Sequence, residues 1–188
     1  MKLSRAKWKT APVYRTRPLP VGELHGTLLL AESVVPATRD ALTSFALAGI
    51  RDGGHEGMAF WAGHEAGDTT IILQVIVPNA AHSDQRVMAS AGAVGEAARV
   101  ARRSGLGILC QVHSHPGDDA RHSDGDDEMV LLPFEGMLSI VVPNFGLRFD
   151  GLSGACVHQF QQGRWVLCSE ESVRSHVTVI PSRVDLRA

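Results

Sequence analysis

The sequence predicts an α/β domain built around a mixed β-sheet flanked by helices, and three observations lead to this prediction. Strand-like apolar runs alternate along the chain with segments whose apolar residues recur at helical spacing. Residues 71–77, IILQVIV, are dense enough in branched apolar side chains to form a buried central strand. The length of 188 residues suits one globular domain with a core of its own.

The first half of the chain shows three strand patterns and two helix patterns. Pro36 is expected to end the first strand, Asp52-Gly53-Gly54 the first helix, and Gly105 the second helix. The strands are expected over 24–35, 57–62 and 70–77, and the helices over 37–51 and from after Asp84 to about Arg103.

The second half begins with a strand over 106–112 and continues into a segment rich in turn residues, 113–126. The residues from Ser175 onward fit both a strand and a frayed tail. The remaining expected elements are a short helix to about Leu132, a strand over 138–142, and hairpin-like segments around 148–151, 155–160 and 164–169.

The first 20 residues differ in composition from the rest. They carry six Lys or Arg and three Pro without a periodic apolar pattern, which is typical of a disordered basic arm. We therefore expect a single domain over residues 21–180, preceded by this arm at 1–20 and followed by a tail at 181–188.

Charge and cysteine content exclude several classes of protein. Lys and Arg number 18 against 20 Asp and Glu, so there is no basic field for a nucleic acid. Cys110, Cys156 and Cys168 form no CxxC pair and indicate a reducing compartment. The arm lacks an apolar signal-peptide core, and no apolar run is long enough for a bilayer. We expect a cytoplasmic protein without nucleic-acid or membrane partners.

Residues 111–128, QVHSHPGDDARHSDGDDE, contain a candidate metal site. His113 and His115 lie two apart at the end of a predicted strand, so both imidazoles project from the same face. Ser123 is expected to cap the next helix, which places Asp126 in its first turn. Two His and one carboxylate leave a fourth position for water, the arrangement of a catalytic zinc site rather than a structural one.

These residues carry a family resemblance. His113-Ser-His115-Pro116, then seven residues from His115 to Ser123, then Ser123-x-x-Asp126, resembles the signature of the JAMM/MPN (JAB-type) zinc isopeptidases. The resemblance extends over about residues 37–142 and implies the JAMM/MPN-type fold, which is similar to that of cytidine deaminases. It also implies a standalone catalytic domain like the bacterial deubiquitinase-like members.

The family pattern also places a glutamate before a Gly-rich strand. The segment 56–63, EGMAFWAG, fits it with Ala59 and Trp61 as departures, and the segment starting at Glu23 fits the letters equally well. We prefer Glu56, because it follows a predicted helix and precedes a strand that ends in Val-Pro-Asn, as in the family.

The resemblance implies a mechanism, a substrate class and partners. Zn²⁺ held by His113, His115 and Asp126 would activate a water, with Glu56 as general base and then acid and Ser123 as oxyanion donor. The implied reaction hydrolyses the isopeptide or peptide bond after the C-terminal glycine of a ubiquitin-like protein. The implied partners are the E1- and E2-like enzymes of a bacterial ubiquitin-like conjugation or antiphage defence operon.

Two other functions stay open at this point. A non-catalytic MPN-like scaffold would keep the fold, and protein without stoichiometric zinc would favour it. A RadC-like DNA-associated protein shares the HxHP and SxxD strings, but the charge balance argues against it. A zinc nucleoside deaminase would need HxE and PCxxC, which the sequence lacks.

Other polar residues are expected to be structural or solvated. His122 is interpreted as a solvated loop residue, and His25, His82, His158 and His176 as isolated surface or capped core residues. Cys110 is interpreted as a small buried hydrophobe, and Phe60 and Trp61 as core residues on opposite faces of a strand. The acids near the motif are expected to be solvated, namely Asp118, Asp119, Asp124, Asp127 and Glu128.

Overall fold

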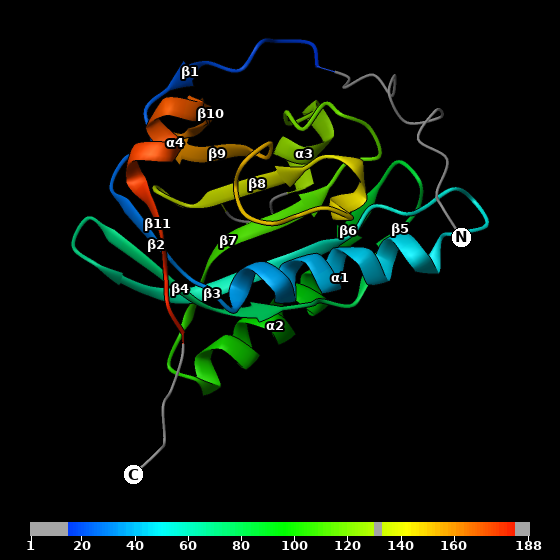
Figure 1. The fold of residues 1–188 in the computed structure, drawn as a ribbon, viewed down its shortest axis with the longest axis horizontal. Coiled ribbons are helices and arrows are strands. Elements are labelled where there is room, and N and C mark those ends of the chain that lie inside the picture. Colours follow the sequence, from blue (N-terminus) through cyan, green and yellow to red (C-terminus); the bar gives the residue numbers. More distant parts are fainter. Residues whose placement is uncertain (1–14, 130–132, 183–188) are drawn as a thin grey trace.

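The computed structural model describes residues 15–129 and 133–182. Within these ranges the chain alternates strands and helices, as the sequence predicts (Figure 1). The strands are β1 (Val21–Gly22), β2 (Thr27–Ala31), β3 (Met58–Ala66), β4 (Thr69–Ile76), β5 (Ala80–His82), β6 (Val87–Ala89), β7 (Gly107–Ser114), β8 (Leu138–Val142), β9 (Cys156–Gln161), β10 (Arg164–Cys168) and β11 (Val177–Ile180). The helices are α1 (Val34–Ala48), α2 (Ala91–Arg103), α3 (Asp124–Met129) and α4 (Glu170–His176), with a 3-10 turn over Asn144–Gly146.

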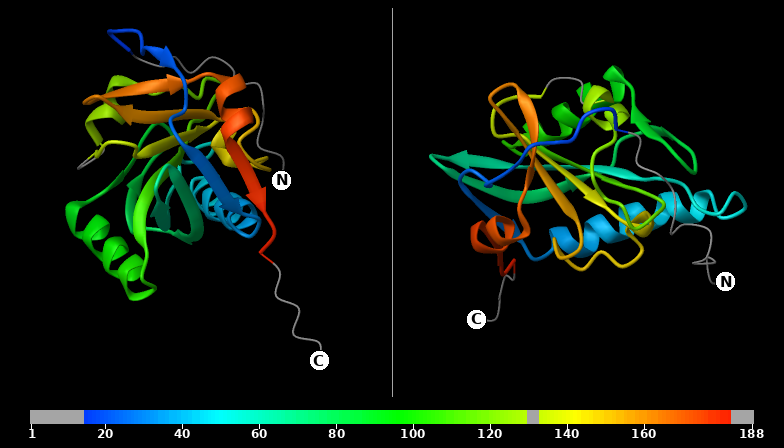
Figure 2. Two further views of the ribbon diagram at one scale, coloured as in Figure 1. Left: turned by 90° about the vertical axis from the view of Figure 1, so that its left-hand side faces the viewer. Right: turned by 90° about the horizontal axis from the view of Figure 1, so that it is seen from above.

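Nine strands form one mixed sheet in the order β1-β10-β9-β8-β7-β3-β4-β2-β11, and β5 and β6 pair separately. β7 runs parallel to β8, and β2 runs parallel to both β4 and β11. In a flat sheet β1 and β2 would lie roughly 33 Å apart, at about 4.8 Å per strand. The link over residues 23–26 reaches at most roughly 18 Å. The sheet must therefore curl, which brings its two edges together (Figure 2).

The two long helices cover opposite faces of the sheet. Trp61 is fully buried on the α1 side, where its Nε1 donates to Thr38 Oγ1 of α1 at 2.8 Å. Phe60 points the other way and packs with the apolar face of α2. The expected core roles of both residues are confirmed, and Figure 2 shows the sheet lying between the two helices.

The first strand and helix differ from the prediction. β2 covers only 27–31, and α1 begins at Val34 and ends at Ala48 instead of covering 37–51. Pro36 lies inside the first turn of α1 rather than ending a strand. A proline is tolerated there because the first backbone N–H groups of a helix have no intrahelical acceptor.

The hairpin β3–β4 is longer than predicted. β3 runs to Ala66, and the turn is confined to Gly67-Asp68 rather than the whole segment 63–68. Gly63, the last glycine of the family pattern, lies in the strand at a register shift. A side chain on Gly63 would collide with the carbonyl oxygen of Ile71. Glycine therefore allows the two backbones to approach at this bulge.

The hairpin β5–β6 was not predicted. Val87 and Met88 belong to β6, and α2 begins only at Ala91, with the Ser90 hydroxyl accepting from Ala93 N. Val87 and Met88 fit the helical spacing of α2 and a strand equally well, so periodicity alone does not place the boundary.

The second half follows the prediction with two differences, and one open alternative is decided. β8, β9 and β10 lie where strands were expected, but residues 148–151 contain bends instead of a strand. Helix α4 was not predicted. Of the two structures that the residues from Ser175 onward fitted, a strand and a frayed tail, the strand forms as β11, which pairs with β2. The predicted continuation of α3 to Leu132 and the expected tail beyond residue 182 lie outside the described residues, as do arm residues 1–14.

Residues 15–20 of the expected arm are part of the described structure. The carbonyl of Pro20 accepts from Leu167 N of β10 at 2.9 Å, and Leu19 packs beside Trp165. Among the helices of the described residues, none combines the length and hydropathy needed to cross a bilayer.

Candidate metal centre

Three of the predicted residues converge on one buried point. His113 Nε2 lies 3.3 Å from His115 Nε2, and each is 3.2 Å from an oxygen of the Asp126 carboxylate. The exposed fractions of the three residues are 4%, 7% and 4%. Within the described ranges, these residues form the group of His, Cys and acidic side chains that could hold a metal ion.

The spacing of these atoms fits a tetrahedral metal site. Two ligands at about 2.0–2.1 Å from a tetrahedral ion lie roughly 3.3 Å apart. The two imidazole nitrogens match that value with their separation of 3.3 Å, and each lies 3.2 Å from a different carboxylate oxygen, His113 from Asp126 Oδ1 and His115 from Asp126 Oδ2. Two neutral imidazoles and one carboxylate are also ligands of the kind that zinc takes in catalytic sites.

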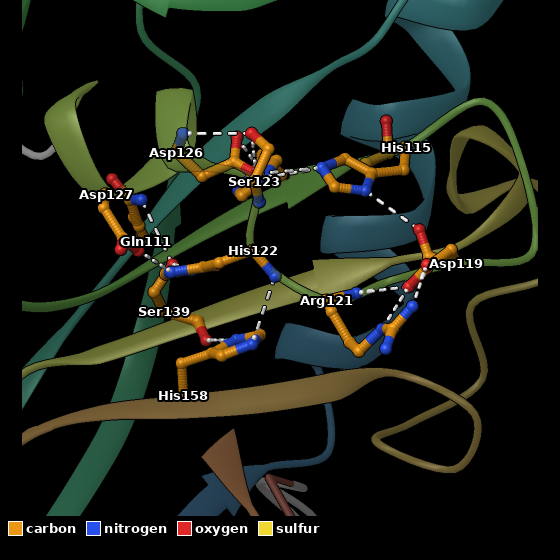
Figure 3. Close-up of polar contacts among 12 residues, drawn as sticks. Gln111, His115, Asp119, Arg121, His122, Ser123, Asp126, Asp127, Ser139 and His158 are labelled. Carbon is orange, nitrogen blue, oxygen red and sulfur yellow. Dashed lines mark hydrogen bonds and ion pairs between the residues drawn. The ribbon is translucent and has the colours of Figure 1, made fainter. Parts of the chain in front are cut away.

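Strand β7 explains the placement of the two histidines. β7 runs through His113 to Ser114, and His115 N continues its pairing with β8 by donating to Val142 O at 2.9 Å. Both rings therefore lie on the same face of the sheet. The carbonyl of Asp119 lies 2.9 Å from His115 Nδ1 and accepts its proton, which leaves Nε2 free for a ligand (Figure 3).

Ser123 and Asp126 form the expected capping box at the start of α3. The Ser123 hydroxyl accepts from Asp126 N at 3.2 Å, and the Asp126 carboxylate accepts from Ser123 N at 2.6 Å. The Ser123 hydroxyl also lies 2.7 Å from Asp126 Oδ2 (Figure 3). The cap fixes the carboxylate in the first turn, facing β7.

Glu56 lies beside the same site, whereas Glu23 does not. Glu56 N donates to Ser83 O at 2.8 Å, and Gly57 is tied by two bonds of 2.9 Å to Ser114, the residue between the two histidines. Glu56 is 6% exposed and interacts electrostatically with His115 and Asp126. Glu23 is exposed, and its carbonyl accepts from Gln161 of β9.

Burial controls the charges at this site. Desolvation raises the pKa of Glu56 to about 8, against an opposing effect of His115. Burial also opposes ionisation of Asp126, but His113 and His115 outweigh it and hold the pKa of Asp126 well below its usual range. The pKa of His115 is raised, because its contacts with Asp126 outweigh its own burial. Without a metal, Asp126 is thus ionised.

The prediction for His122 was wrong. Its side chain is fully buried, with Nδ1 at 2.8 Å from Asp127 Oδ1 and Nε2 at 2.8 Å from Ser139 Oγ. Its ring stacks on that of His158 at a centroid distance of 3.8 Å. Burial lowers the pKa of both histidines.

The sequence analysis also missed the buried polar residues that connect to His122 through hydrogen bonds. Gln111, Ser139 and His158 are buried polar residues. Gln111 and Ser139 lie in otherwise apolar stretches, ILCQV and LSIVV, and this was the signal that could have identified them, whereas the stretch around His158, VHQFQ, offered none. Arg15, which contacts Asp127, offered no comparable signal.

The acids near the motif are mostly paired rather than free in solvent. Asp127 pairs with Arg15, Asp119 with Arg121, and Asp118 accepts from Asn144. Asp124 accepts from Thr16 N at 2.9 Å, and the side chain of Glu128 lies outside the described residues.

Cys110 is fully buried, as expected. His82 was expected to be isolated, but its Nδ1 lies 2.8 Å from Nδ1 of His55.

The comparisons with known proteins agree with the fold and the motif. Residues 38–149 match the family of prokaryotic homologs of the JAB domain. A protein of Sinorhizobium fredii named "Probable metalloprotease y4jG" is 38% identical over 117 residues, which are 60% of this chain and 72% of that protein.

Two solved structures share the fold. Protein DSY2949 from Desulfitobacterium hafniense has a TM-score of 0.58 at 14% identity, covering 82% of this chain and 95% of that one. A protein from Salinibacter ruber has a TM-score of 0.50 at 15% identity, covering 75% of this chain and 91% of that one. The expected JAMM/MPN-type fold is thereby confirmed, and the chain belongs to the family of prokaryotic JAB-domain proteins.

Proposed function

We propose that this protein is a zinc-dependent peptidase that hydrolyses the amide bond after the C-terminal glycine of a ubiquitin-like protein. The observation that carries the proposal is the convergence of His113, His115 and Asp126 on one buried point, with a buried glutamate beside them. Membership of the JAB family and the relative named as a metalloprotease support a peptidase-type activity.

The three ligands would hold the zinc ion, and Glu56 would handle the proton. When bound, zinc supplies Lewis acidity, which polarises a carbonyl and makes a water acidic enough to react near neutral pH. A cation beside Glu56 favours the ionised carboxylate, opposing the effect of burial. Glu56 then accepts a proton from the attacking water and delivers it to the leaving amine.

Ser123 is proposed as the donor to the oxyanion that develops on the scissile carbonyl. Its hydroxyl has a single proton, which it donates to Asp126 Oδ2 at 2.7 Å. Rotation of the hydroxyl toward the substrate is therefore part of this role, while Ser123 N remains bonded to Asp126.

The proposed substrate is a carrier protein, either conjugated through an isopeptide bond or fused in a linear precursor. The near-neutral charge of −2 is compatible with a protein substrate recognised by shape. We propose a cytoplasmic role in a bacterial ubiquitin-like conjugation or antiphage defence operon, with its E1- and E2-like enzymes as partners.

The test uses ubiquitin-like proteins encoded near this gene, each fused after its terminal glycine to a fluorescent reporter. Wild-type protein with zinc should cleave at that glycine, and a chelator should abolish cleavage. Glu56→Gln should lower kcat by about 10²–10⁴-fold, whereas Glu65→Gln, a change of an exposed residue at the end of β3, should not.

Two results would overturn the proposal. Full activity of Glu56→Gln would exclude Glu56 as the base. Protein that contains no stoichiometric zinc and cleaves none of the fusions would favour the scaffold function instead.

A further inference from the structure

The segment that precedes β1 lies against residues 122–127, which include the last two residues before α3 and its first turn with Asp126. Arg15 Nη2 donates to Asp127 Oδ2 at 2.7 Å, and Arg15 Nη1 donates to the carbonyls of His122 and Ser123 at 3.1 and 3.3 Å. The side chain of Arg15 is 17% exposed, so this contact is only partly open to solvent. One guanidinium thus contacts both the two residues directly before α3 and the first turn of α3.

A row of buried polar side chains contacts the same segment, residues 122–127, through His122. Gln111, Ser139 and His158 lie opposite one another on β7, β8 and β9. Gln111 Nε2 donates to Ser139 Oγ at 3.1 Å, and His158 Nε2 accepts from His122 N at 3.3 Å. Figure 3 shows the side chain of His122 above Ser139 and His158, with its hydrogen bonds drawn as dashed lines.

These contacts allow one consistent assignment of protons. Ser139 accepts from Gln111 and donates to His122 Nε2, so His122 carries its proton on Nδ1 and donates it to Asp127 Oδ1. Asp127 uses its second oxygen for Arg15. Each hydrogen bond from Gln111 to Arg15 therefore joins a donor to an acceptor, which favours one rigid arrangement, although the buried Nε of Arg15 has no hydrogen-bond partner among the described residues.

Asp126 needs such support because of where it lies. The described part of α3 covers six residues, and isolated helices shorter than about 12–15 residues are marginal in water. The position of its first turn must therefore come from contacts outside the helix. The contacts of Arg15 and His122 bracket the segment 122–127, which contains the ligand Asp126.

We propose that Arg15 and His122 are positioning residues that hold Asp126 at the two imidazoles, so that metal affinity depends on the segment preceding β1. The proposal rests on the metal site of the proposed function. Arg15 and His158 lie outside residues 38–149, the part that matches the family, whereas His122 and Asp127 lie inside it.

The test measures metal binding by the full-length protein, independently of peptidase activity. Zn²⁺ affinity is determined by competition with a chromophoric chelator, and the visible spectrum of the Co²⁺-loaded protein reports the ligand geometry. Arg15→Ala should weaken Zn²⁺ binding by about tenfold, the lower end of the effect of outer-shell changes. Arg17→Ala is the matched control, since Arg17 is exposed on the same segment.

Arg15→Lys supplies a conservative variant. Lysine keeps the charge beside Asp127 but lacks the planar fork that also reaches two carbonyls, so its affinity should fall between those of wild type and Arg15→Ala. The unfolding midpoint of the metal-free proteins is measured alongside, and it should change less than the Zn²⁺ affinity because Arg15 is only partly buried. A purely structural role would lower this midpoint and leave the Co²⁺ spectrum unchanged.

Asp127→Asn tests whether Arg15 affects Zn²⁺ binding through its contact with Asp127. If Arg15 acts through Asp127, the double variant with Arg15→Ala should bind Zn²⁺ about as well as the weaker single variant.

Equal Zn²⁺ affinity of Arg15→Ala and Arg17→Ala would overturn the inference. A wild-type protein that binds no Zn²⁺ would instead refute the proposed function.

Discussion

Replacing Glu56 by Gln should stabilise the metal-free protein at neutral pH. Burial raises the pKa of Glu56 from 4.5 to about 8, so the unfolded chain releases this proton at a lower pH than the folded protein. Glu56 therefore costs no stability below about pH 4.5, and stability is lost as the pH rises toward 8. Each pH unit in this window contributes about 1.4 kcal/mol, which amounts to about 3 kcal/mol at pH 7.

The side chain of Gln has the same shape as that of Glu but does not ionise. The free energy of unfolding of Glu56→Gln should thus exceed that of wild type by about 3 kcal/mol at pH 7 and by less than about 1 kcal/mol at pH 5. Urea unfolding of chelator-treated protein, followed by the fluorescence of the buried Trp61 and Trp165, measures the difference. Glu65→Gln, a change of an exposed residue at the end of β3, is the matched control. A Glu56→Gln protein no more stable than wild type at pH 7 would refute the reasoning.

Two further predictions concern the metal and the sheet. Zn²⁺ affinity should weaken as the pH is lowered from 8 to 6. Contacts with Asp126 outweigh burial and raise the pKa of His115 above its usual 6.5, and an imidazolium cannot bind a metal. Competition titrations that show a constant affinity between about pH 6 and 8 would contradict this. Gly63→Ala should lower the free energy of unfolding by about 3 kcal/mol through its clash with the Ile71 carbonyl. Gly67→Ala, which meets nothing in the turn but has a φ of 60°, should cost only about 1 kcal/mol; equal losses in urea unfolding would exclude a steric role for Gly63.

Local chemistry allowed the ligand set and its geometry to be predicted. Alternation of side chains in a strand places His113 and His115 on one face whatever the rest of the fold does. The capping preference of Ser123 likewise fixes Asp126 through bonds within four residues. Such features depend on neighbours in the sequence, and for that reason they can be read from it.

The misplaced boundaries have a different cause. Val87 and Met88 satisfy the periodicities of both a helix and a strand, and only pairing with β5 decides between them. Pro36 is compatible with the end of a strand and with the first turn of a helix, and the packing of α1 against β3 and β4 selects the second. Each case needed a tertiary contact that local propensity does not contain.

His122 shows the limit most clearly. Its neighbours in the sequence are polar, which favours a solvated loop, yet it is buried because Ser139 and His158 from two distant strands supply its hydrogen bonds. Burying an imidazole without such partners would be costly, so the polar positions in β8 and β9 and the histidine in the loop require one another. The three candidate ligands of this site can be recognised from one short segment of the sequence. The contacts around them join residues more than a hundred positions apart, from Arg15 to Asp127, and only the folded chain brings these together.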